Sequence, residues 1–210
     1  MYSYLCSMKD EKFLQILESA SHLYFTYGIK SITMDDVAKE CNISKKTLYK
    51  YVSDKADLVE KTVSYVFSVN GKKMKDIVES KLNAIEELYE VQTILLNIAS
   101  NYNPSIEYDL KKYYPSILRK IEDTKAEHIY NMMYRNLEKG KKENLYRKDF
   151  DSAFIAKLRV LIVLSKIDDK IVSYKDFMNE DAINEMLKYH LHAVCNETGL
   201  KLMKEIFTTN

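Results

Sequence analysis

The sequence predicts an all-α protein, in which a helix-turn-helix domain of three helices at residues 1–60 is followed by a larger helical domain at residues 61–210. Composition supports this fold class, because the 210 residues include only four Gly and two Pro, which leaves little turn punctuation for a β fold of many strands. Apolar residues also recur at helical spacing, and capping residues stand where such runs begin.

The first helix is expected to begin near Phe13 and to stop at Gly28, which suits a left-handed helix end. Its apolar residues are separated by steps of three and one, so they form one stripe: Phe13, Ile16, Leu17, Ala20, Leu23, Tyr24 and Tyr27. We expect this stripe to pack against the two helices that come next.

A second helix is predicted from Thr33 to about Cys41. The Thr33 hydroxyl can cap backbone N–H groups, and Asp35 and Asp36 suit the positive end of the helix dipole. Asn42 then stands where the chain must reverse, and Asn adopts the left-handed conformation more readily than most residues. The turn is therefore encoded locally.

A third helix of eight or nine residues is predicted to begin at the cap Ser44. Leu48 and Val52 lie one turn apart and form a buried seam with Val37, Ala38 and Ile43. The opposite side points outward and carries Lys46 and Lys50, with Thr47 and Tyr49 beside them and Lys45 and Tyr51 flanking the seam. A helix of roughly 12–14 Å matches the width of a DNA major groove, about 12 Å. The pattern therefore favours a DNA-reading surface.

The charge balance supports DNA binding only locally. Residues 30–61 carry seven Lys against six acidic residues, whereas residues 42–52 carry three Lys and no acid, in a chain of net charge +1. One such face should hold DNA weakly, so useful affinity is expected from two faces on one duplex, that is, from a homodimer.

Several linked segments between Phe13 and Glu60 resemble the N-terminal domain of the tetracycline-repressor-like (TetR) family of bacterial transcription regulators. Ile16–Tyr24 is similar to the first helix of that family, Thr33–Ala38 to its second, and Ile43–Tyr51 to its recognition helix. Ser53–Leu58 resembles the start of its fourth helix. Two positions depart from the family pattern: Asn42 stands where Gly is frequent, and Val52 where Phe is frequent.

The resemblance implies a set of DNA contacts. Thr33 and Lys55 would meet phosphates, Lys45, Lys46 and Thr47 would approach base edges or phosphates, and Tyr49 and Tyr51 would touch the backbone. Together with the cap Ser44 and the outward Lys50, the predicted DNA-binding residues are Thr33, Ser44, Lys45, Lys46, Thr47, Tyr49, Lys50, Tyr51 and Lys55.

Beyond residue 62 the sequence predicts further helices. A long helix should follow Ser53 or Asp54, and Asn70-Gly71 either kinks it or ends it. The others are expected at Ile85–Ser100, Ile106–Tyr113, Ser116–Glu138, Ser152–Ser165 and Glu180–Phe207, with breaks at Asn103-Pro104, Tyr114-Pro115 and Lys139-Gly140. Ser152–Ser165 and the apolar seam of Glu180–Phe207 are proposed to pair with their symmetry mates in a four-helix dimer interface, as the resemblance also implies. The alternative is an intramolecular core.

Seventeen Tyr and nine Met without Trp suggest an adaptable pocket in the second domain. The candidate ligand-binding residues are Tyr102, Tyr113, Tyr130, Met133 and Tyr134. The alternative for each is a simple core position. An apolar or aromatic small molecule is expected to fit better than a highly charged one, because no cluster of buried cations is evident.

Other function classes find little support. The chain has no nucleophile triad order, phosphate-binding glycine loop or dinucleotide fingerprint, so no enzyme and no cofactor are expected. Cys6, Cys41 and Cys195 are odd in number and widely spaced, which argues against disulfides; Cys41 is expected to pack, and a redox role for Cys6 or Cys195 is the alternative. His190, His192 and Cys195 do not converge on one helix, so no metal is expected.

The predicted partners are a double-stranded DNA operator, a second copy of the chain and a small ligand. No membrane segment is evident, so the cytoplasm is expected. The leading hypothesis is a repressor that a small molecule releases from its operator. The alternatives are an architectural or partner-binding protein without a ligand, and a helical ligand-binding protein that has lost DNA recognition.

Overall fold

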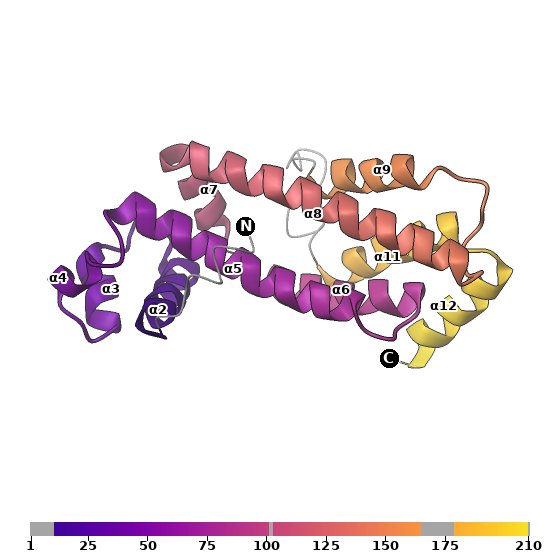
Figure 1. Ribbon diagram of the computed structural model, residues 1–210, viewed down its shortest axis with the longest axis horizontal. Coiled ribbons are helices and arrows are strands. Elements are labelled where there is room, and N and C mark those ends of the chain that lie inside the picture. Colours follow the sequence, from indigo (N-terminus) through magenta and orange to yellow (C-terminus); the bar gives the residue numbers. More distant parts are fainter. Residues whose placement is uncertain (1–10, 101–102, 165–178, 210) are drawn as a thin grey trace. The chain divides into compact units, whose positions relative to one another are not determined.

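A computed structural model describes residues 11–100, 103–164 and 179–209, and this part of the chain is all-α, as predicted (Figure 1). Its helices are α2 (Glu11–Tyr27), α3 (Met34–Glu40), α4 (Lys45–Leu48), α5 (Lys55–Val78), α6 (Ala84–Ser100), α7 (Pro104–Tyr113), α8 (Pro115–Lys142), α9 (Ser152–Leu164), α11 (Glu180–Val194) and α12 (Glu197–Thr209). None of the helices described is long and apolar enough to cross a membrane.

The chain divides into two compact units that are not continuous in sequence. The first takes in residues 1–70 and 101–121, and the second takes in residues 71–100 and 122–210, as far as they are described. Helices α5 and α8 each begin in the first unit and end in the second. Since α7 belongs to the first unit, a self-contained domain at residues 1–60 stays a prediction.

The first unit is built around the predicted stripe of α2. Ile16, Leu17 and Ala20 are fully buried and share one core with side chains from α3, α4 and α5. Helix α2 ends at Gly28, whose φ of 82° confirms the predicted left-handed end. Burial of this stripe holds α3 and α4 in place.

Helix α7 packs onto the end of α2. The side-chain amide of Asn103 donates to the carbonyl of Phe25 at 2.8 Å, and the backbone N–H of Lys30 donates to the Asp109 carboxylate at 2.8 Å. A Cβ at Gly28 would come within 2.9 Å of the Ser105 hydroxyl oxygen, so glycine permits this close approach. Asn103 also caps α7, and Pro104 is its first residue, which confirms the break predicted there.

The second unit buries a polar cluster within its apolar core. Glu87 is 1% exposed and accepts from the Lys139 ammonium at 2.7 Å. The buried amide of Asn136 donates to Glu87 at 3.2 Å and accepts from the Tyr146 hydroxyl at 3.1 Å. Each of these groups has a hydrogen-bond partner, which offsets the cost of removing it from water.

The break predicted at Lys139-Gly140 is wrong, and of the two alternatives at Asn70-Gly71 the helix end is excluded, because both helices continue through their glycines. Helix α5 runs past Asn70-Gly71 to Val78, and α8 runs past Gly140 to Lys142. Gly140 is required for a contact from outside the helix: the buried ring of Tyr146 lies directly against it. The chain leaves α8 at Asn144 instead, which has a φ of 55°.

The single helix predicted over Glu180–Phe207 is also wrong, because it is two helices. Cys195 has extended backbone and pairs with Tyr146, and the N–H of Arg147 donates to the Val194 carbonyl at 2.8 Å. Asn196 then caps α12 by accepting from the N–H of Gly199 at 3.0 Å. These contacts with the loop after α8 end α11, and nothing local in the sequence signals them.

The apolar seam predicted on the last helix is not open for a partner. Ile183, Leu187, Leu191 and Val194 are each at most 6% exposed within the single chain, and α11 packs against α6 and α12. For this seam the alternative interpretation, an intramolecular core, is the one that the structure supports. Burial also raises the pKa of the Cys195 thiol to about 12, which disfavours the redox role considered for it.

Two of the helical glycines, Gly140 and Gly71, provide a matched test of this packing. Gly140→Ala should lower the free energy of unfolding by about 1–3 kcal/mol, because the new methyl group overlaps the immobile Tyr146 ring. Gly71→Ala on α5 meets open space and should raise it by up to about 1 kcal/mol through helix propensity. Urea denaturation followed by circular dichroism measures both; equal effects of the two substitutions would contradict the packing described.

Candidate nucleic-acid interface

Helix α3 begins with a reciprocal cap. The hydroxyl of Thr33 accepts from the Asp36 N–H at 3.2 Å, and the Thr33 N–H donates to the Asp36 carboxylate at 2.8 Å. Hydrogen bonds from the Thr33 hydroxyl and N–H hold the pKa of Asp36 below its usual range. The predicted cap is confirmed, and Thr33 is exposed at the start of α3.

The turn between α3 and α4 has the predicted conformation. Asn42 has a φ of 52°, and the N–H of Ile43 donates back to the Ala38 carbonyl at 2.9 Å. Ser44 caps α4 by accepting from the N–H of Thr47 at 3.0 Å. Asn42 therefore adopts the left-handed conformation at the position where Gly is frequent in the family pattern.

The recognition segment is less helical than predicted, since α4 is a four-residue helix, about 6 Å long, rather than eight or nine residues. Beyond it the hydrogen bonds tighten to a spacing of three: Lys50 N–H donates to Thr47 at 3.1 Å and Tyr51 N–H to Leu48 at 3.0 Å. Val52 then enters the core at 2% exposure, with its N–H donating to the Leu48 carbonyl at 3.3 Å, and α5 begins at Lys55.

The predicted inner and outer sides of this segment are confirmed. Leu48 is fully buried, and Lys46, Tyr49 and Lys50 are exposed. Lys45 is also exposed, but its ammonium donates to the Asp35 carboxylate at 3.0 Å, which raises the pKa of Lys45. Within the described residues, Lys46 and Lys50 have no ion-pair or hydrogen-bond partner, so their charges are available to an external anion.

Two predicted contact residues are tied to the protein itself. The ring of Tyr51 stacks on Phe13 with centroids 5.7 Å apart. The half-buried Lys55 donates to the Lys30 carbonyl at 3.2 Å, and burial lowers the pKa of Lys55. Their predicted contacts with the DNA backbone stay predictions.

A second basic and aromatic group lies on the first unit and was missed by sequence reasoning. The Lys30 ammonium lies 5.0 Å from the centre of the Tyr113 ring, and a hydrogen bond from Lys30 lowers the pKa of Tyr113. Lys112 on α7 donates to the Tyr108 hydroxyl at 2.8 Å. Lys30 and Lys112 are far apart in sequence, so no local pattern joins them.

The predicted ligand-binding residues are divided between the two units. Tyr102 lies outside the described residues, and Tyr113 is 39% exposed on the first unit rather than in the second. Tyr130 and Tyr134 stack on α8 at 6.1 Å, with Tyr134 40% exposed, and Met133 is a core residue. A role of these residues in ligand binding stays a prediction.

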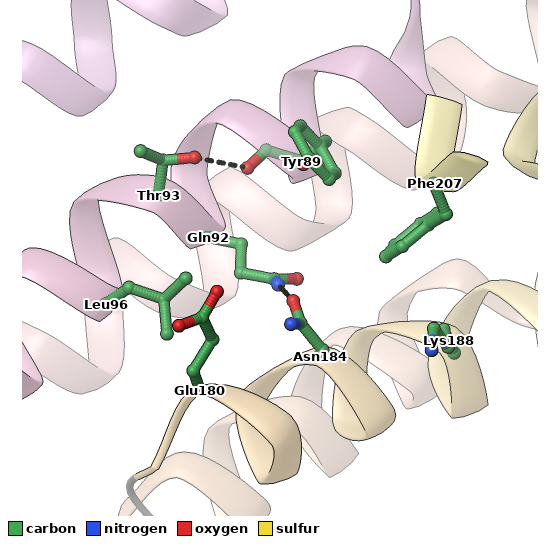
Figure 2. Close-up of a pocket in the computed structure, with 8 residues that line it drawn as sticks. All are labelled: Tyr89, Gln92, Thr93, Leu96, Glu180, Asn184, Lys188 and Phe207. Carbon is green, nitrogen blue, oxygen red and sulfur yellow. Dashed lines mark hydrogen bonds between the residues drawn. The ribbon is translucent and has the colours of Figure 1, made fainter. Parts of the chain in front are cut away.

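A cleft of about 270 Å³ lies in the second unit between α6, α11 and α12 (Figure 2). It is lined by Tyr89, Gln92, Thr93, Leu96, Glu180, Asn184, Lys188 and Phe207, none of which was predicted. Figure 2 shows the Gln92 amide meeting Asn184, to which its nitrogen donates, while its oxygen points toward Phe207. The rings of Tyr89 and Phe207 meet edge to face at 5.3 Å.

Comparison with known proteins agrees with this geometry. The sequence profile of the bacterial regulatory proteins of the tetR family matches residues 16–62. YvaF of Bacillus subtilis (strain 168), an uncharacterized HTH-type transcriptional regulator, is 34% identical over 85 residues, which are 40% of this chain and 45% of YvaF. The match thus spans about half the length of this curated relative.

Solved structures show the same fold over most of the chain. A transcriptional regulator from Cytophaga hutchinsonii ATCC 33406 superposes with a TM-score of 0.73 at 17% identity, covering 89% of this chain and 100% of that one. The SmeT–triclosan complex superposes with a TM-score of 0.63 at 12% identity, covering 90% and 93%.

The capped helix pair, its outward lysines and the helical second unit define the chain as a helix-turn-helix protein of the transcription-regulator class. Its residues 16–62 match the TetR family of bacterial regulatory proteins.

The ion pair between Lys45 and Asp35 gives a test of the surface. Asp35→Asn should tighten binding to nonspecific duplex DNA a few-fold at low salt and steepen its salt dependence, because Lys45 is released to a phosphate. The matched control Asp36→Asn weakens the capping box of α3, because it replaces the carboxylate that accepts from Thr33, and should lower the melting temperature instead. Fluorescence anisotropy across a salt series measures the affinity, and unchanged affinity in Asp35→Asn would contradict a role for Lys45 at the DNA.

Proposed function

We propose that this protein is a dimeric, sequence-specific DNA-binding repressor that a small molecule releases from its operator. The observation that carries the proposal is the surface of α4 and the turn after it. There, buried Leu48 and Val52 force Lys46 and Lys50 outward, and neither lysine is neutralised by a described acid. Cations held in this way on a rigid, capped element suit phosphates and base edges.

The proposal requires two copies on one duplex. A single short basic segment in a chain of net charge +1 gives weak affinity, whereas two recognition segments one DNA turn apart, roughly 34 Å, read both halves of a palindrome. Helix α9 offers a surface for pairing: Phe154, Leu158 and Leu161 follow one another at helical spacing and are 62%, 41% and 67% exposed. An apolar face of this kind is typical of an interface, and a second copy of α9 is its proposed partner.

The ligand is proposed to act on the second unit. SmeT, which has the same fold, was solved as a complex with triclosan, and the cleft of about 270 Å³ beside α6 supports a ligand site in the second unit. Helix α6 leads along the chain to α7, and α7 holds the end of α2 through Asn103 and Asp109. A ligand that favours a different position of these helices would change the spacing of the two recognition segments.

Selection of bound duplexes from a random DNA pool at near-physiological salt tests the function. The full chain should recover a palindrome with half-sites about one turn apart. The Lys46→Ala/Lys50→Ala variant should recover none, because its outward cations are gone. Lys72→Ala/Lys73→Ala on α5, which removes the same charge from exposed positions elsewhere, should behave as the parent chain.

Other outcomes of the selection point elsewhere. Enrichment without a shared sequence, together with a steep salt dependence, would favour an architectural protein over an operator reader. No enrichment at all would contradict the function.

A further inference from the structure

Arg159 lies on the inner side of α9. The exposed side of this helix carries Phe154, Leu158 and Leu161, whereas Arg159 falls on the other side with the fully buried Ala156. The Arg159 side chain is partly buried, and its Nε has no contact with solvent. That nitrogen has no acceptor among the described residues. A charged side chain is thus directed into the second unit.

His190 presents a second unpartnered group from α11. It is 5% exposed, it lies among the core-facing residues Leu187 and Leu191, and its Nε2 has no hydrogen-bond partner in the described part of the chain. Burial and the positive charge of Arg159 lower the pKa of His190 to about 3. The imidazole is therefore neutral at pH 7. Ala156 of α9 and Leu187 and Leu191 of α11 belong to one core cluster, so Arg159 and His190 lie on helix sides that face the same interior.

A partly buried guanidinium whose Nε has no acceptor and which has no counter-ion among the described residues is unfavourable. Burial lowers the pKa of Arg159, and none of the described carboxylates forms an ion pair with it. Replacing a buried charge by an apolar side chain is often stabilising, so a protein that keeps one without compensation has a use for it. The two unsatisfied nitrogens, from α9 and α11, would both be satisfied by one anionic group.

We propose that Arg159 and His190 bind the anionic group of the ligand, a carboxylate carried on an apolar or aromatic body; this inference rests on the proposed ligand-responsive function. One guanidinium matches one negative charge, and its planar fork suits a carboxylate. Ile155 on α9 and Leu187 and Leu191 on α11 supply apolar neighbours for the body of the molecule. The sequence predicts an apolar or aromatic ligand without strong charge. The proposal adds one anionic group to that ligand.

Thermal unfolding of the full chain tests the site without DNA. The probes are sodium phenylacetate and sodium hexanoate, their neutral amides phenylacetamide and hexanamide, and sodium chloride and phosphate at matched ionic strength. The carboxylates should raise the melting temperature by a few degrees at millimolar concentration, and the amides and inorganic salts should not. Arg159→Met should abolish the shift, and Lys157→Met, which removes an exposed cation from the same helix, should retain it.

A second readout separates binding from a structural role. Without any ligand, Arg159→Met should melt at or above the temperature of the parent chain, because an uncompensated buried charge has been removed. A drop of several degrees would show that the guanidinium anchors the fold through an internal partner and would overturn the proposal. Equal shifts with the amides, shifts with inorganic anions alone, no shift with any probe, or a shift that survives in Arg159→Met would also overturn it.

The duplex selection keeps the two proposals apart. Arg159→Met should recover the same palindrome as the parent chain, since Arg159 lies in the second unit and the recognition segment in the first. A palindrome recovered without any carboxylate effect would leave the DNA-binding function standing and remove the anion site. A rise in melting temperature with the carboxylates but no recovered palindrome would leave the anion site standing and remove the DNA-binding function.

Discussion

Burial of Leu48 fixes the orientation of the recognition segment and of the lysines on its outer side. This side chain has no exposed surface and shares one core with Val37 and Val52. Burying an apolar side chain of this size stabilises a protein by about 1.5–3 kcal/mol, so the short recognition segment cannot turn another side outward without losing that contribution. Lys46 and Lys50 are exposed because Leu48 is not. The caps at Thr33 and Ser44 and the left-handed turn at Asn42 then set where this contact forms.

The sequence predicted the first unit well because its signals are local. A capping hydroxyl, a left-handed Asn and a terminal Gly act within four residues of their own position, so Ser44, Asn42 and Gly28 could be interpreted without the rest of the fold. The length of α4 was overestimated because the hydrogen bonds of Lys50 and Tyr51 close at a spacing of three rather than four, which the sequence pattern does not signal.

The second unit was predicted less well because its decisive contacts join distant residues. Its neighbours in sequence suggest that Gly140 ends a helix, yet Gly140 lies within α8 and the Tyr146 ring packs directly against it. The division between α11 and α12 depends on backbone pairing with the loop after α8, and the place of α7 beside α2 depends on Asp109. To identify Arg159 and His190 as a pair, one must know which side of each helix is buried. Both this pair and the outward lysines leave polar groups without partners, which is the pattern expected where function limits stability.

Hydroxyl-radical footprinting of the full chain on a recovered duplex tests the central claim most directly, because it reports which sugars two copies cover at once. The account predicts two protected patches on one face of the duplex, with centres about one helical turn apart, and loss of both patches when either half-site is scrambled. A single protected patch, or uniform protection along the duplex, would contradict a dimeric reader of a palindromic operator.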